Sequence, residues 1–237
     1  GNYYFNQKRY YAALDNFDML SSFPKHAASA KMGVARACQK LERWDRVIDA
    51  YTDIVLLQPS PKEQHLAKFI YADALYQLGQ FEKAYLHYKD AASKMPEYYL
   101  DDPQSVFQYG EVAYRLGHHD EAHPLFNTFY KTHAKNQPAD LPLVLARIAN
   151  KARIDGNEEL TDQASDAVYT MKLEDPKVRT GKMIVSTGRL AALNCPIPCS
   201  SDQVGQSLNH IEKEADQIFL MASVPSITTQ GAMVDWL

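Results

Sequence analysis

The chain contains few cysteines, few tryptophans and no long hydrophobic run. Its 237 residues include 3 cysteines and 2 tryptophans. A small and odd number of cysteines argues against a disulfide framework. No apolar stretch reaches the roughly 18 residues that a membrane-spanning helix needs. The sequence therefore predicts neither a disulfide scaffold nor a membrane span.

The first residues, Gly1-Asn2-Tyr3-Tyr4, contain neither the basic nor the apolar region of a secretory signal. They also lack a methionine, and this start favours a natural protein that extends further toward its N-terminus. We expect a cytoplasmic location.

Positive charge is also scarce, with 25 lysines and arginines against 29 aspartates and glutamates, a net charge of -4. A protein that neutralises many phosphates needs a cationic face, so we expect no nucleic acid as the main partner. Hydrophobic residues make up 46% of the chain, which is typical of a globular protein. Tryptophan is scarce, but the other aromatic residues are abundant, with 15 tyrosines and 9 phenylalanines.

A recurring pattern of aromatic and small residues organises the first two thirds of the chain. Its small or aliphatic anchor recurs 34, 37, 38 and 38 residues apart, at Ala13, Val47, Ala84, Ala122 and Leu160. In the first four copies a ring lies three residues before the anchor and another lies four residues after it. These pairs are Tyr10 and Phe17, Trp44 and Tyr51, Phe81 and Tyr88, and His119 and Phe126. A period of this length indicates repeated supersecondary units.

The residues before each anchor predict a helix and a turn. Val34-Ala35, Cys38 and Leu41 are spaced so that they share one helical face. The same spacing recurs in the third and fourth copies, and more weakly in the fifth. Gly79, Gly117 and Gly156 follow these stretches, where a left-handed C-cap favours glycine. Each unit is therefore predicted to be a helix, a tight turn and a second helix, with Cys38 buried between helices.

Residues 1–168 resemble tetratricopeptide repeats, a family of helical hairpins of about 34 residues. The agreement is strongest from Leu78 to Ala84, followed by Tyr88, Ala91 and Pro96. The tryptophan usual in the family's first helix is missing. The resemblance implies an all-α, right-handed superhelical solenoid of five hairpins, the first truncated and the fifth degenerate.

Residues 169–237 are predicted to form a C-terminal helical extension and tail that packs on the last repeats. The apolar spacing predicts a helix over 182–193 and a longer one from Ser201-Asp202 to about Ala222. A stack of repeats leaves an apolar face open at its end, which these helices would cap. The apolar tail over 224–237 has two open interpretations, a further cap or a free ligand for a partner.

Motifs for catalysis or metal binding are weak. The string His119-Asp120-Glu121-Ala122-His123 is similar to a zinc-protease motif, but aspartate occupies the place of its glutamate. We also expect His119 to lie outside the helix, with Asp120 as its N-cap. Cys195 and Cys199 could hold a metal or form a disulfide, although free thiols are favoured. We expect no enzymatic activity, cofactor or metal, and keep a metal-dependent enzyme around His119/His123 as the rival hypothesis.

The resemblance also implies that the first helix of each unit lines a concave groove. Carried over to this chain, the groove residues and one neighbour are Ser29, Met32, Arg36, Gln39, Leu66, Phe69, Asp73, Tyr76, Gln104, Phe107, Glu111, Tyr114 and Arg115. We expect Phe69 with Phe107, and Tyr76 with Tyr114, to form two aromatic rows that offer a large contact area. The alternative is that Phe69 and Phe107 extend the core. The lysine and asparagine set with which some family members grip a chaperone carboxylate is absent.

These features favour a non-enzymatic scaffold or adaptor that binds a protein or peptide segment with apolar anchors. A narrower alternative is a secretion-type chaperone. Residues 3–92 are similar to the repeat chaperones of type III secretion translocators, mainly through the segments 35–40 and 75–79. Whether the chain forms a homo-oligomer or joins a larger complex stays open.

Overall fold

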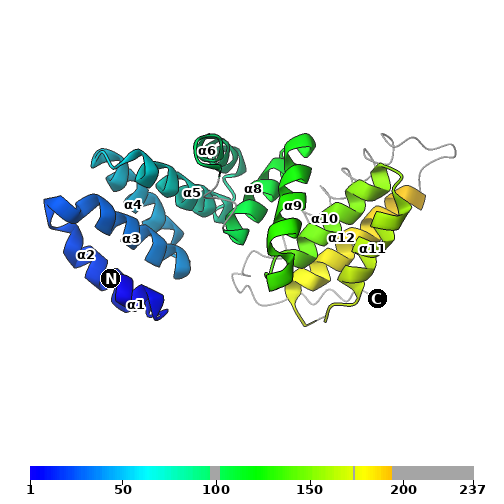
Figure 1. Ribbon diagram of the computed structural model, residues 1–237, viewed down its shortest axis with the longest axis horizontal. Coiled ribbons are helices and arrows are strands. Elements are labelled where there is room, and N and C mark those ends of the chain that lie inside the picture. The colour runs from blue at the N-terminus through cyan, green and yellow to red at the C-terminus, as the bar shows by residue number, and fades with distance from the viewer. Residues whose placement is uncertain (97–101, 173, 194–237) are drawn as a thin grey trace, which may run out of the picture. The chain divides into compact units, whose positions relative to one another are not determined.

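The computed structural model describes residues 1–96, 102–172 and 174–193, and this part of the chain is helical without any strand (Figure 1). The predicted all-α class is confirmed. The chain divides into two compact units, Gly1–Val144 and Leu145–Leu237. The predicted boundary at residue 168 lies inside the second unit.

The first unit consists of consecutive antiparallel helix pairs. The pairs are α1 (Asn2–Asn6) with α2 (Tyr10–Ser21), α3 (Ala27–Lys40) with α4 (Trp44–Leu56), α5 (Pro61–Gln77) with α6 (Phe81–Lys94), and α8 (Pro103–Arg115) with α9 (His119–His133). Short 3-10 turns precede α3 at Pro24–His26 and follow α9 at Ala134–Asn136. The first helix of one pair also contacts the first helix of the next, α3 against α5 and α5 against α8. This arrangement is consistent with a helical repeat.

The turns inside the hairpins share one backbone geometry. A residue with positive φ closes the first helix in each, at Lys8, Glu42, Gly79, Gly117 and Gly156, which lie 34, 37, 38 and 39 residues apart. The next N–H then donates to the carbonyl five residues earlier, as in the Schellman motif, at 2.8–2.9 Å. The predicted helix–turn–helix units are thus confirmed at the three glycines. The first two turns have the same geometry although a side chain at positive φ costs about 1–2 kcal/mol.

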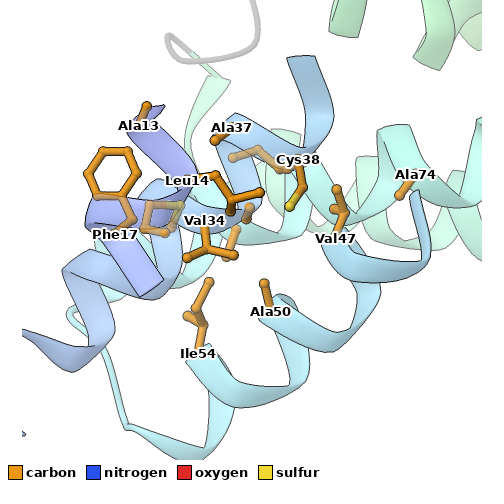
Figure 2. Packing of buried hydrophobic residues seen from close by; sticks show 14 residues of the cluster. Ala13, Leu14, Phe17, Val34, Ala37, Cys38, Val47, Ala50, Ile54 and Ala74 are labelled. Carbon is orange, nitrogen blue, oxygen red and sulfur yellow. The ribbon is translucent and has the colours of Figure 1, made fainter. Parts of the chain in front are cut away.

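A hydrophobic core fills the space between the helices of the first pairs (Figure 2). The anchors Ala13 and Val47 are fully buried in it, and so is Cys38, as predicted. Small residues let the rings of neighbouring helices approach closely. A Cβ atom added at Gly33 would lie 2.5 Å from the Phe17 ring, so the ring rests directly on the backbone of α3.

Two of the first helices begin at side-chain caps. Ser60 and Glu63 form a capping box at α5, because the Ser60 hydroxyl accepts from the Glu63 N–H at 3.3 Å and the Glu63 carboxylate accepts from the Ser60 N–H at 3.1 Å. At α8, the Asp102 carboxylate accepts from the Gln104 N–H at 3.3 Å. Proline follows each cap as the first helical residue, where it costs little.

The second unit contains the later part of α10 (Leu141–Ile154), α11 (Glu158–Tyr169) and α12 (Pro176–Leu193). The helix predicted over 182–193 is confirmed and begins earlier, at Pro176. A Cβ atom added at Gly188 would lie 2.3 Å from Asn150 Oδ1, so α12 packs closely on α10. The predicted helix from Ser201, the pair Cys195 and Cys199, and the tail over 224–237 lie outside the described residues.

Candidate binding pocket on the first helices of the hairpins

A pocket of about 460 Å³ lies on the first helices of the hairpins in the first unit. Residues of α1, α3, α5 and the start of α8 line it: Phe5, Arg36, Gln39, Lys40, Leu66, Phe69, Ile70, Asp73, Asp102 and Ser105. The structure therefore brings together five residues of the predicted groove, those at 36, 39, 66, 69 and 73. It adds Phe5, Lys40, Ile70, Asp102 and Ser105, which the sequence did not indicate. We call this hollow the groove pocket.

Asp73 is the most buried charged group of the groove pocket, with 1% of its surface exposed. Gln39 Nε2 donates to Asp73 Oδ2 at 2.6 Å, and Ser105 Oγ lies 3.3 Å from the same oxygen. The Tyr88 hydroxyl donates to Asp73 Oδ1 and lies 2.9 Å from Gln108 Oε1. Since these residues come from α3, α5, α6 and α8, one carboxyl group links three consecutive hairpins.

The surroundings of Asp73 change its acidity. Burial raises the pKa of the Asp73 carboxyl from 3.8 to about 7, because a charged carboxylate is poorly solvated there. The bonds from Tyr88 and Ser105 and the charge of Lys40 act in the opposite direction, and the negative charge of Asp102 raises the pKa further. Burial also raises the pKa of Tyr88 well above its ordinary value, so its hydroxyl stays protonated.

The rim of the groove pocket carries positive charge. Arg36 and Lys40 lie one helical turn apart on α3, and both side chains are exposed. The Arg36 guanidinium lies 5.0 Å from the centre of the Phe5 ring, a cation–π arrangement. Neither side chain forms an ion pair with a described residue.

Four other predicted groove residues are buried away from the groove pocket. Met32 belongs to the core cluster with 7% exposure. The Phe107 ring is 5% exposed and lies 6.4 Å from the Phe129 ring, and Tyr114 is 8% exposed. Glu111 is 4% exposed and accepts from Arg115 Nε at 3.1 Å. The expectation that these positions are spared from packing is therefore corrected. In α8 every residue from Ser105 to Tyr114 is buried, so little of this helix is left for a partner.

The tyrosines of the second expected row have ring neighbours in their own hairpins. The Tyr76 ring lies 5.7 Å from Phe81, and the Tyr114 ring lies 4.7 Å from His119 and 5.8 Å from His123. These contacts join the end of each first helix to the start of its second helix. Arg115 is likewise engaged, with its guanidinium 5.1 Å from the Phe81 ring.

The prediction that His119 lies outside the helix is wrong. Gly117 carries the left-handed turn and His118 is the N-cap, so α9 begins at His119 and continues through Pro124. The rings of His119 and His123 therefore lie on one helical face, 6.2 Å apart. Within residues 1–96, 102–172 and 174–193, no group of three or more histidines, cysteines, aspartates or glutamates could hold a metal ion.

Cys38 is a free cysteine that is buried in the core. Burial raises the pKa of its thiol, which disfavours the nucleophilic thiolate.

Comparison of the sequence with protein-family models and with curated proteins finds no match. None of the described helices combines the length and the apolar character needed to cross a bilayer.

Proposed function

We propose that the protein is a non-enzymatic adaptor that binds a segment of a partner protein in the groove pocket. The observation that supports this proposal is the position of the pocket, which follows the first helices of consecutive hairpins. A surface shared by several repeats suits an extended or helical segment better than a compact metabolite.

We further propose that the hairpins form a tetratricopeptide-like solenoid. The five left-handed turns recur 34 to 39 residues apart, close to the period of that family. Contacts of α3 with α5 and of α5 with α8 are those expected when first helices line one face. The narrower hypothesis of a secretion-type chaperone stays a prediction, because it concerns the identity of the partner.

The chemistry of the groove pocket fits a peptide with an apolar anchor. Leu66, Phe69 and Ile70 contribute its apolar part. Phe69 and Ile70 are 4% and 5% exposed, so Phe69 extends the core as the alternative interpretation held, and the half-buried Leu66 is the most accessible of the three. Binding sites generally combine such an apolar lining with a few polar groups that fix orientation. Gln39 and Ser105 could supply these groups, since both lie at the pocket beside Asp73.

The test is selection of peptides from a random displayed library on the immobilised full chain. We expect Leu66→Asp to lower the affinity for the selected peptides by about tenfold or more, because it places a charge among the apolar side chains of the pocket. Leu86→Asp is the matched control, since Leu86 is 64% exposed on α6 and does not line the pocket. Melting temperatures of both variants show whether they stay folded. Equal binding by the two folded variants, or no selected peptide at all, would refute the proposed function.

A further inference from the structure

We infer that the partner segment carries an acidic side chain next to its apolar anchor, and that Arg36 and Lys40 receive this acid. The inference rests on the proposed function and specifies the chemistry of the partner. It is drawn from the charges that line the groove pocket and from the bonds that those charges already make.

The two cations of the rim are available to a partner. Arg36 and Lys40 are exposed, line the groove pocket from one face of α3, and lack a carboxylate partner among the described residues. Four other lysines of the first unit form ion pairs with carboxylates of the chain, among them Lys31 with Asp53 at 2.7 Å, and Lys68 with Asp90. A partner carboxylate that reaches α3 would therefore meet two positive charges that form no ion pair with a described residue, of which Lys40 also acts electrostatically on the buried Asp73.

The acids of the groove pocket are, in contrast, already engaged. Asp73 accepts hydrogen bonds from Gln39 and Tyr88, has Ser105 Oγ within 3.4 Å of both carboxylate oxygens, and is 1% exposed. Asp102 caps α8 through the Gln104 N–H and accepts from Ser105 Oγ at 3.0 Å. Asp73 is out of reach of a basic segment because it is buried, and part of the acceptor capacity of Asp102 is already used, so charge complementarity favours an acidic segment.

The apolar and cationic parts of the groove pocket are contiguous. The Arg36 guanidinium lies against the Phe5 ring, which lines the same hollow as Leu66 and Phe69. Contact with the ring restricts the guanidinium before a partner binds, which lowers the entropic cost of pairing. An acid placed a short distance from a leucine or phenylalanine side chain would meet both parts at once.

The experiment compares four proteins in the same library selection: the full chain, the variant Leu66→Asp, the double variant Arg36→Glu with Lys40→Glu, and the control Lys25→Glu with Lys135→Glu. The control makes the same change of net charge at two exposed lysines that do not line the groove pocket. Thermal melts establish that each variant is folded. Selected peptides are then measured one by one by fluorescence anisotropy at two salt concentrations.

The inference predicts that the unaltered chain selects peptides in which aspartate or glutamate lies near a large apolar residue. The double variant should bind these peptides at least about tenfold more weakly and should select lysine or arginine instead, whereas the control should bind as the unaltered chain does. Added salt should weaken binding to the unaltered chain.

Other outcomes overturn the inference in distinguishable ways. In the first case, the selected peptides are neutral or basic, or they bind the double variant as well as the unaltered chain, while Leu66→Asp abolishes their binding. The proposed function is then supported, and the inference of an acidic partner segment is refuted. If Leu66→Asp also has no effect, both fail. If the chain self-associates and Leu66→Asp makes it monomeric, the occupant is a second copy and the acidic segment is refuted.

Discussion

At the scale of single residues, Asp73 connects the stability of the fold to the groove pocket. Its carboxyl group is buried, accepts hydrogen bonds from α3 and α6, and belongs to a residue that lines the pocket where we propose that a partner binds. A buried acid without a cation in contact is stable mainly in its protonated form. The protonation state of one residue therefore affects three hairpins together.

This arrangement predicts a pH dependence of stability. The pKa of Asp73 is about 7 in the folded chain against 3.8 for an ordinary aspartate, so the folded state holds a proton that the unfolded state has released. The contribution of Asp73 is fully present below about pH 3.8 and is lost as the pH rises to about 7. The expected decrease in the free energy of unfolding over this range is on the order of a few kcal/mol.

Urea denaturation across this pH range, with Asp73→Asn as the comparison, measures the effect. The asparagine cannot ionise, so the variant should lose less stability than the unaltered chain as the pH rises. If the free energy of unfolding depends on pH in the same way in both proteins, the assignment of the raised pKa to Asp73 is contradicted.

Sequence reasoning found part of the candidate site at this scale. Arg36, Gln39, Phe69 and Asp73 were predicted from the resemblance to tetratricopeptide repeats, which assigns these positions of each first helix to a groove, and all four line the groove pocket. The bond from Tyr88 to Asp73 was not predicted, because the repeat pattern gives only the position of this ring four residues after the anchor Ala84. A ring can pack while its hydroxyl reaches another helix, and that direction depends on the tertiary arrangement.

At the scale of elements, the shared turn explains why hairpins with different sequences adopt the same form. Glycine takes positive φ at little cost, and periodicity followed by glycine was enough to predict the later turns. Nothing in the sequence marked the same geometry at Lys8 and Glu42, since a lysine or glutamate in the left-handed region has no local signature. These two turns form because the helices on either side pack together.

Replacing a non-glycine residue by glycine at one of these turns should stabilise the chain, and replacing a glycine by alanine should destabilise it. Glu42→Gly should raise the free energy of unfolding by roughly 1 kcal/mol, because glycine relieves the strain at φ 55°. Gly79→Ala should lower it by roughly 1 kcal/mol through backbone strain, since an added Cβ atom meets nothing within 4 Å.

Chemical denaturation of both variants checks this pair. Glu82→Gly is the matched control, because the same substitution within α6 should destabilise the chain. A loss of stability on Glu42→Gly would show that the glutamate side chain contributes more than its backbone strain costs.

At the scale of the whole molecule, the described helices form sequential pairs whose first helices meet in the first unit. The helical class and the hairpins could be predicted because both depend on local periodicity. The burial of Phe107, Glu111 and Tyr114 could not, because it depends on how completely the neighbouring helices enclose α8. The groove pocket accordingly lies mainly on α3 and α5.

The central claim is that a partner segment binds to the first helices, and amide chemical shifts measure this most directly. A peptide selected from the displayed library is titrated into the isotope-labelled full chain. We predict that the largest shifts fall on lining residues of α3 and α5, such as Arg36, Gln39 and Leu66. Shifts concentrated on the second helices α4 and α6, with the lining residues unchanged, would contradict the account.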